Sequence, residues 1–254
     1  MINDKRILSI VLARKGSKGI KNKNFRFLMG RPLVQWSILA SYYSKCVDIT
    51  VVSSNCDDVY KAFSDLRNEF SCIYGPKLTD EKLKWIQRPD ELAQDLTTNE
   101  PVMIHAVQES IQRFDLDPDI IVMLQPTSPC RIEGLLDKCI EKYNEGGYDS
   151  LISGIKETPF IWQFINGEWK FTVDKNGCCN RKMRQDFLDH EFIFHDDGNI
   201  YITDKDILIK TKCRIGKKPV FFEVKGINSI QIDEEFDFNL IENMAKVLKL
   251  ESLI

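Results

Sequence analysis

Apolar residues in this chain gather in short continuous runs, and polar or glycine-containing segments separate these runs. Residues 7–12, for example, are apolar and partly β-branched, with only Ser9 intervening. A run of this length is typical of a strand that is buried on both faces, as in a parallel sheet. The same pattern predicts strands at 7–12, 48–52, 119–124, 150–155 and 220–224, and a weaker one at 72–74.

Between these runs, apolar residues recur with the three- and four-residue spacing of helices. Leu33, Trp36, Leu39 and Ala40 show this spacing directly after Pro32, which suits a first helical turn. We expect helices at about 33–43, 58–66, 101–114, 133–143 and 237–248. The alternation of strands and helices predicts an α/β fold, a doubly wound and mostly parallel sheet that binds ligands at the carboxyl ends of its strands.

The pattern changes between residues 156 and 189, where aromatic residues crowd both sides of a turn dipeptide. Trp162 and Phe164 precede Asn166-Gly167, and Trp169 follows it. Asn-Gly between apolar residues is typical of a two-residue hairpin turn. We therefore expect a β-hairpin excursion at 156–189 within a single domain that covers 1–254.

Composition restricts the classes of function. Apolar residues make up 43% and charged residues 29%, as in a soluble globular protein. The net charge of −3 argues against general nucleic-acid binding. The eight cysteines form no C-x-x-C pair, so reduced cytosolic thiols are expected instead of zinc ligands. Neither a leader segment nor an apolar run of about 18 residues is visible, so we expect a cytoplasmic protein without membrane contact.

The segment after the first predicted strand, 13–24, is rich in glycine and cations. Gly16 and Gly19 allow tight turns that expose backbone N–H groups, and Ser17 adds a hydroxyl. The cations are Arg14, Lys15, Lys18, Lys21 and Lys23, with no acidic residue among them. Such a loop suits a nucleoside triphosphate, although a solvated basic turn remains the alternative. Neither a Walker A sequence nor G-x-G-x-x-G is present.

Residues 13–24 resemble the A-R-x-G-S-K-G-[IL]-x-x-K-N loop of the cytidylyltransferases that activate sialic acid and related nonulosonic acids. Three further segments are similar to signatures of that family. Residues 88–95 match R-P-x-x-L-A-x-D, 125–131 match Q-P-T-S-P-x-R, and 229–237 match S-I-D-I-D-T-x-x-D with Gln231 at the first aspartate. The resemblance covers nearly the whole chain and implies a Rossmann-like nucleotidyltransferase fold.

The resemblance also implies roles for individual residues. The nucleotide-binding residues would be Ala13, Arg14, Gly16, Ser17, Lys18, Lys23, Asn24 and Arg88. The sugar-binding residues would be Gln125, Thr127, Ser128, Arg184, Gln185 and Tyr201. Arg14, Lys18 and Asp233 would be catalytic, and Asp233 and Gln231 would hold Mg²⁺ or Mn²⁺. Two alternatives stay open: Arg88 could lie on the surface, and 125–131 could be a purely structural turn.

Gln231 brings an uncharged oxygen to a position where the family has a carboxylate, which weakens the expectation of tight metal binding. Asp237 is expected to cap the last helix and not to replace the missing ligand.

The activity implied is transfer of CMP from CTP to the anomeric hydroxyl of a nonulosonic acid, with release of pyrophosphate. The 156–189 excursion would reach a second subunit and make a homodimer, the alternative being a hairpin folded on its own subunit. Two other functions stay open. One is another sugar nucleotidyltransferase, either forming CMP-Kdo or using UTP, and the other is a non-catalytic nucleotide-binding relative.

Overall fold

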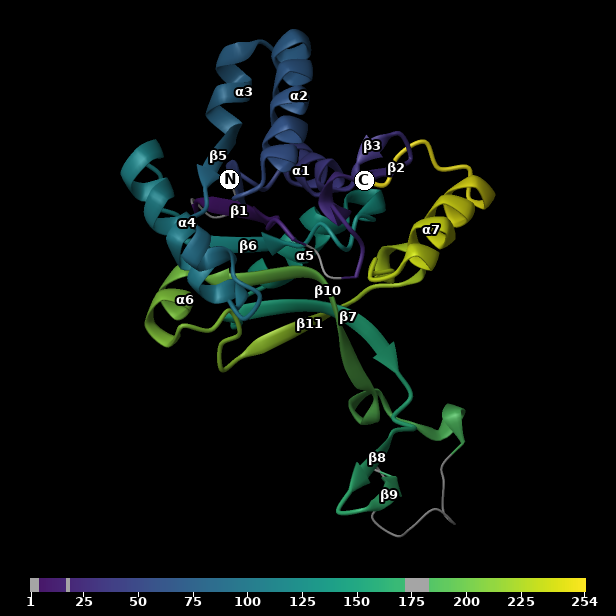
Figure 1. The fold of residues 1–254 in the computed structure, drawn as a ribbon. Helices are drawn as coiled ribbons and strands as arrows, with labels where there is room; N and C mark the ends of the chain where they lie inside the picture. Colours follow the sequence, from purple (N-terminus) through teal and green to yellow (C-terminus); the bar gives the residue numbers. More distant parts are fainter. Residues whose placement is uncertain (1–4, 17–18, 172–182) are drawn as a thin grey trace.

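The structure is a computed structural model that describes residues 5–16, 19–171 and 183–254, and its centre is one twisted sheet (Figure 1). The sheet has seven strands in the order β11-β7-β10-β6-β1-β4-β5. They are β1 (Ile7–Leu12), β4 (Ile49–Ser54), β5 (Leu83–Gln87), β6 (Ile120–Leu124), β7 (Ser150–Glu157), β10 (Ile193–Asp204) and β11 (Pro219–Glu223). Only β10 runs antiparallel to its neighbours. The predicted mostly parallel sheet is therefore confirmed.

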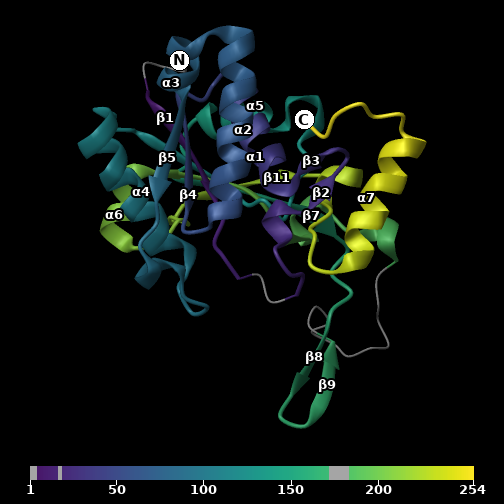
Figure 2. The ribbon, with the colours of Figure 1, turned by 45° about the horizontal axis from the view of Figure 1, so that its top comes forward.

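Helices cover both faces of the sheet (Figures 1 and 2). They are α1 (Leu33–Tyr43), α2 (Asp57–Tyr74), α3 (Pro76–Lys82), α4 (Asn99–Phe114), α5 (Leu135–Asn144), α6 (Lys205–Thr211) and α7 (Glu235–Val247). Alternate residues of β1 point to opposite faces, so Ile7 and Val11 pack in the core with α1, α2 and α5, whereas Leu8 and Ile10 pack against α4. Two cores, one on each face, explain why β1 is apolar almost throughout.

The edge of the sheet differs from the prediction at 72–74. These residues form the last turn of α2, and the strand beside β4 is β5, which follows α3. Phe70 is fully buried, so the apolar face of the helix continues past Leu66, and the helix ends only at Gly75 with a φ of +86°. Leu83 and Ile86 of β5 are buried, whereas the three other residues of this edge strand are partly or fully exposed.

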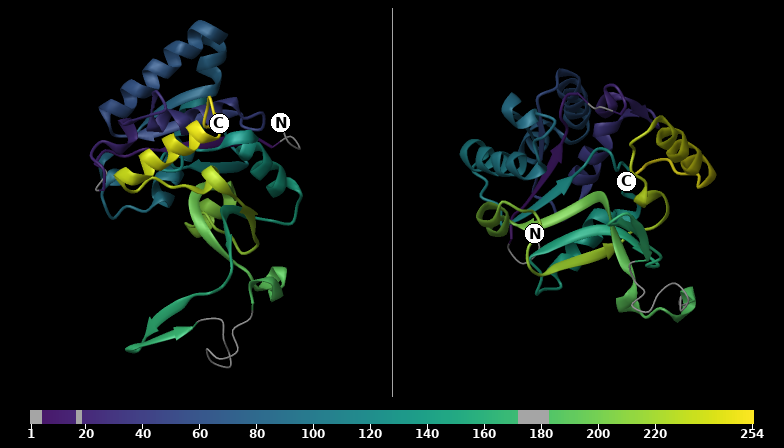
Figure 3. Two further views of the ribbon diagram at one scale, coloured as in Figure 1. Left: turned by 90° about the vertical axis from the view of Figure 1, so that its right-hand side faces the viewer. Right: turned by 60° about the horizontal axis from the view of Figure 1, so that its bottom comes forward.

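The hairpin predicted around Asn166-Gly167 is confirmed. β8 (Trp162–Ile165) pairs antiparallel with β9 (Glu168–Phe171). Asn166 and Gly167 have φ values of +53° and +85°, as a type I′ turn requires. The hairpin projects away from the sheet and its helices (Figures 1 and 3). In this structure it therefore does not fold back onto the main sheet of its own subunit.

Within the described residues, none of the helices combines the length and the apolar character needed to cross a bilayer.

Candidate active site

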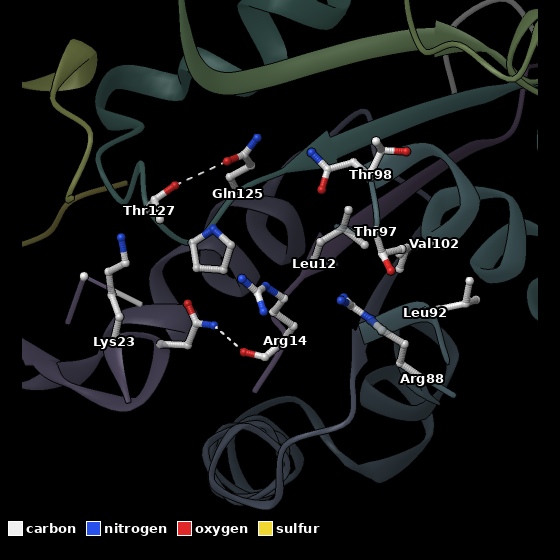
Figure 4. Close-up of a pocket in the computed structure, with 14 residues that line it drawn as sticks. Leu12, Arg14, Lys23, Arg88, Leu92, Thr97, Thr98, Val102, Gln125 and Thr127 are labelled. Atoms are coloured by element: carbon white, nitrogen blue, oxygen red, sulfur yellow. Dashed lines mark hydrogen bonds between the residues drawn. The ribbon is translucent and has the colours of Figure 1, made fainter. Parts of the chain in front are cut away.

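A polar cavity of about 250 Å³ lies at the carboxyl ends of β1 and β6, where the fold is expected to bind ligands (Figure 4). Its lining comes from four separate parts of the chain. The lining residues are Leu12, Arg14, Gly19, Lys23, Asn24, Arg88, Leu92, Thr97, Thr98, Asn99, Val102, Gln125, Pro126 and Thr127. Six of the residues proposed from the sequence are among them: Arg14, Lys23, Asn24, Arg88, Gln125 and Thr127.

The basic loop, residues 13–24, begins where β1 ends. Ala13 is buried, and its N–H donates to the carbonyl of Ser53 at the end of β4 (3.2 Å). Arg14 then enters the cavity, where its Nη1 pairs with Asp95 Oδ1 at 2.7 Å. Asn24 closes the loop because its side-chain amide donates to the carbonyl of Arg14 (3.2 Å). Gly16 adopts a φ of +83° beside this loop, whereas Ser17 and Lys18 lie outside the described residues.

Gly19 brings the basic loop against the C-terminal signature, which is residues 229–237. A Cβ added at Gly19 would lie 2.9 Å from the carbonyl oxygen of Asp233, a distance that no side chain tolerates. Lys23 joins the same two segments, because its Nζ donates to the carbonyl of Ile232 (2.6 Å) and lies 3.3 Å from Asp233 Oδ1. Lys23 is only 8% exposed. Its ammonium group is therefore a fixed positive charge in the cavity wall.

Arg88 is buried in the wall beside Arg14, so the alternative of a surface arginine is wrong. Its Nη2 donates to the carbonyl of Ser53 (2.7 Å), and its Nε donates to Ser53 Oγ (3.3 Å). Burial, together with repulsion from Arg14, lowers the pKa of Arg88 to about 10. The guanidinium still remains charged at neutral pH, so two arginines and Lys23 give the cavity a positive lining.

The turn after β6 connects directly to the C-terminal signature. Thr127 Oγ1 donates to Gln125 Oε1 (3.4 Å) and accepts a hydrogen bond from Gln231 Nε2 (3.3 Å). The N–H of Ile232 donates to the carbonyl of Thr127 (2.7 Å). Ser128 was expected to line the cavity, but it does not. It is 1% exposed, and its hydroxyl donates to the carbonyl of Asp197 (3.4 Å), so it anchors the turn to β10.

Three of the proposed sugar contacts lie outside this cavity. Arg184 and Gln185 are exposed in a short 3₁₀ helix (Arg184–Asp186) of the excursion. Tyr201 is 4% exposed in β10, where its hydroxyl donates to Asp196 Oδ1 (2.6 Å). Burial and this hydrogen bond raise the pKa of Tyr201. Direct contact of these residues with a sugar stays a prediction.

Residues 8–82 match a family model described as "Cytidylyltransferase". The chain is 27% identical to N-acylneuraminate cytidylyltransferase A of Danio rerio over 93% of this chain and 50% of that protein. It is 27% identical to CMP-N,N'-diacetyllegionaminic acid synthase of Legionella pneumophila, over 98% of this chain and 100% of that protein. The chain is thus similar to cytidylyltransferases. It spans about half the length of the zebrafish relative and the full length of the bacterial one.

Solved structures of low sequence identity share the fold of this chain. A 4-diphosphocytidyl-2C-methyl-D-erythritol synthase from Anaerococcus prevotii is 14% identical with a TM-score of 0.65, over 96% of this chain and 98% of that one. A CMP:2-keto-3-deoxy-manno-octonic acid synthetase complexed with CTP is 12% identical with a TM-score of 0.63, over 96% and 100%. These likenesses support the predicted nucleotidyltransferase architecture.

The C-terminal signature can supply only part of a metal site. The part of the chain that the structure describes contains no cluster of three or more His, Cys, Asp or Glu side chains arranged around one point. Mg²⁺ in nucleotide sites is usually held by one or two carboxylates together with phosphates and water. The side chain of Asp233 is 68% exposed beside the cavity, with Gln231 nearby, so the residues fit that limited role. Asp237 caps α7 as predicted, accepting from the N–H groups of Asp233 and Glu234 (both 2.8 Å).

The cavity also contains residues that the sequence did not single out. Thr97, Thr98 and Asn99 lie at the start of α4 and form a polar wall of the cavity. Asp95 pairs with Arg14. A polar cluster before a helix is usually a cap, so nothing in the sequence alone indicated a ligand there. Arg131 belongs to the matched Q-P-T-S-P-x-R segment, but no local pattern indicates that its guanidinium is buried and donates to the carbonyl of Gln125 in the cavity wall.

Proposed function

We propose that this protein transfers CMP from CTP to the anomeric hydroxyl of a nonulosonic acid and releases pyrophosphate. One observation carries the proposal: the basic loop, the 125–131 turn and the 229–237 segment surround one cavity, although they are far apart in sequence. The named similarity to enzymes that make CMP-activated acids of this class supports it. The likeness to a CMP-Kdo-forming enzyme covers the fold only and keeps that acceptor as the second candidate.

The cations of the cavity account for the nucleotide half of the reaction. Arg14 and Lys23 would bind phosphate oxygens and offset the negative charge that builds on the departing pyrophosphate. Lys18 and Ser17 stay predicted contacts. Arg14 is now paired with Asp95, whose side chain is 46% exposed, so a triphosphate can compete with this carboxylate. The ammonium group of Lys23 is already held in place, so it needs no reorganisation during the reaction.

The acceptor would lie on the Gln125 side of the cavity. Its hydroxyl oxygen forms a bond to the α-phosphorus of CTP and loses its proton to solvent, and the bond from that phosphorus to the bridging oxygen of pyrophosphate breaks. Thr127 is hydrogen-bonded to both Gln125 and Gln231, so Gln125 and Thr127 can orient the acceptor. Asp233 and Gln231 would hold Mg²⁺ or Mn²⁺, which when bound neutralises phosphate charge.

Pyrophosphate release tests this proposal. The purified protein is incubated with CTP, UTP, ATP or GTP and with a panel that includes N-acetylneuraminate, a legionaminate, a pseudaminate and Kdo, with and without Mg²⁺. We expect metal-dependent release only with CTP and a nonulosonic acid, together with the matching CMP-sugar by mass spectrometry. Release only with Kdo would support the second candidate. Release with UTP would indicate another sugar nucleotidyltransferase. No release in any combination would favour a non-catalytic nucleotide-binding protein.

A Gln231→Asp variant should bind the metal more tightly. The new carboxylate would lie near Asp233, and a second negative ligand favours a hard cation. We expect the Mg²⁺ concentration for half-maximal rate to fall by about threefold to tenfold, measured by pyrophosphate release. Gln231→Asn is the matched control, because it shortens the side chain equally and loses the bond to Thr127 without adding charge. Equal behaviour of the two variants would contradict a place for residue 231 near the metal.

The homodimer is also part of the proposal. The excursion exposes large apolar side chains that an isolated subunit leaves in water, including Trp162 (47% exposed), Phe164 (62%) and Trp169 (67%). A second copy of the chain would cover them, and Arg184 and Gln185 could then reach the partner's cavity.

We place the protein in the cytoplasm, because its six described cysteines are all free thiols.

A Phe164→Asp/Trp169→Asp variant should be monomeric. These two side chains face each other across the hairpin with ring centroids 5.3 Å apart, so two charges there remove the apolar patch at its centre. Sedimentation velocity should show about half the mass of the unmodified protein. Val247→Asp, an exposed apolar position (81%) at the end of α7, is the control and should stay dimeric. A dimer in both proteins would show that the excursion is not the interface.

A further inference from the structure

The cavity is lined by cations, and a carboxylate at its rim pairs with one of them. Among the described residues that line the cavity, Arg14, Lys23 and Arg88 are cationic and none is acidic. Asp95 is not part of this lining, but its Oδ1 lies 2.7 Å from Nη1 of Arg14. An anionic ligand that enters the cavity therefore meets an arginine that already has an anionic partner.

The carboxylate of Asp95 offers Arg14 the same kind of contact that a phosphate offers. Carboxylate and phosphate oxygens both accept charge-assisted hydrogen bonds from guanidinium groups. Arg14 and Arg88 both point into the cavity (Figure 4), and their positive charges repel each other. Asp95 offsets this repulsion, as the phosphate groups of a nucleotide would. Arg14 has further N–H donors, but a phosphate that binds to them beside Asp95 would meet its negative charge.

Asp95 lies near the tip of a turn that is closed by its own hydrogen bonds. The side-chain amide of Gln94 donates to the carbonyl of Asp90 (2.7 Å) within this turn. Leu96, directly after Asp95, is 94% exposed, so the tip is not packed against the core. The carboxylate of Asp95 can therefore move away from Arg14 without disturbing the sheet or its helices.

The ion pair is weak enough for a nucleotide to replace it. The side chain of Arg14 is 33% exposed and that of Asp95 is 46% exposed. Water and salt screen ion pairs that are as exposed as this one. A triphosphate carries several negative oxygens and can contact Arg14, Lys23 and Arg88 together, so it outweighs a single carboxylate. Pyrophosphate meets the same competing carboxylate after the transfer, which favours its release.

We propose that Asp95 competes with phosphate groups for Arg14 and thereby weakens the binding of both CTP and pyrophosphate. This inference rests on the proposed function and adds a control on its nucleotide half. The ion pair opens when CTP binds and forms again when pyrophosphate leaves. Asp95 acts through Arg14 and does not contact the reacting atoms, so it affects the affinity for phosphate groups and not the affinity for the acceptor.

An Asp95→Asn variant tests this inference, because asparagine has nearly the same shape as aspartate but no charge. Isothermal titration with CTP and with pyrophosphate, both in the presence of Mg²⁺, should give dissociation constants about two- to fivefold lower than for the unmodified protein. This factor is what a partly exposed ion pair is worth. The KM for CTP should fall by a similar factor. The KM for the acid and the inhibition constant of cytidine, which has no phosphate, should stay unchanged.

Asp90→Asn is the matched control. Asp90 is exposed in the same turn, and its carboxylate accepts from the side-chain amide of Asn55 (2.9 Å). The variant removes the same charge and should change both dissociation constants less than about 1.5-fold, since a distant exposed charge is screened. In an Arg14→Gln background, Asp95→Asn should lose most of its effect on CTP binding, because the residue through which it acts is gone.

The outcomes separate this inference from the function on which it rests. Pyrophosphate release together with unchanged or weaker CTP binding in Asp95→Asn would overturn the competition and leave the proposed function intact. Tighter CTP binding in Asp95→Asn without any pyrophosphate release would support the competition and overturn the proposed transfer. No binding of CTP to either protein would overturn both. Tighter binding of CTP and pyrophosphate in Asp95→Asn, and not in Asp90→Asn, is the expected result.

Discussion

A Lys23→Met variant is expected to lose about 10²- to 10³-fold in kcat while remaining folded. This range is the usual cost of removing one preorganised charge or donor from a transition state. Lys23 is 8% exposed, and its Nζ is fixed by the carbonyl of Ile232 and by Asp233. It thus contributes positive charge at the point where the basic loop meets the proposed metal ligand. Initial rates of pyrophosphate release at saturating CTP measure the effect.

Lys21→Met is the comparison for this prediction, because it removes the same charge two residues earlier from an exposed position. We expect less than about a threefold change in kcat there, since an exposed charge acts mainly at long range and is screened by salt. Equal losses in the two variants would mean that the loop acts through its overall potential. In that case the position of the Lys23 ammonium group would have no special importance.

Most of the fold could be predicted from local patterns. The strands β1, β4 and β6 are central and covered on both faces, and apolar residues dominate their sequences. The edge strand β5 could not be predicted because its five residues show neither a continuous apolar run nor a regular alternation, with only Leu83 and Ile86 buried. The Asn166-Gly167 hairpin was predicted because a type I′ turn restricts two consecutive residues.

The candidate site was predictable only where a contiguous motif marked it. Arg14, Lys23, Gln125 and Thr127 all belong to such motifs, and the structure brings them to one cavity. Pairings between distant segments could not be predicted. Arg214 meets Glu100 across 114 residues of sequence, and only the packing of α4 and the loop after α6 against the same face of the sheet brings them together.

An Arg131→Met variant should be strongly destabilised. Arg131 is 1% exposed and holds three elements together: Nη1 donates to Ser37 Oγ of α1 (3.0 Å), and Nη2 donates to the carbonyls of Gln125 and Asn199 (both 3.1 Å). Removing it leaves these acceptors unpaired and leaves the buried Asp197 without a neighbouring cation. We expect the free energy of unfolding to fall by about 3–5 kcal/mol, and the unfolding midpoint by about 6–20 °C. Urea and thermal denaturation measure both.

The pH dependence of this loss distinguishes a charge effect from a packing effect. Burial raises the pKa of Asp197, and the positive charge of Arg131 partly opposes that rise. With a raised pKa the folded state binds more protons than the unfolded state, so stability falls as pH rises above the ordinary aspartate pKa of about 3.9. Without Arg131 the pKa of Asp197 should rise further, so the stability difference between the variant and the unmodified protein should grow from acidic to neutral pH.

Asp197→Asn removes this titration but can keep the oxygen that accepts from Ser153 Oγ (2.7 Å) and from the N–H of Asn199 (3.1 Å). In this background, Arg131→Met should therefore cost less at neutral pH, and the cost should no longer depend on pH. If the cost were instead the same at every pH in both backgrounds, Arg131 would act through packing and hydrogen bonds alone. The buried guanidinium would then stabilise the turn under the cavity without any electrostatic coupling to Asp197.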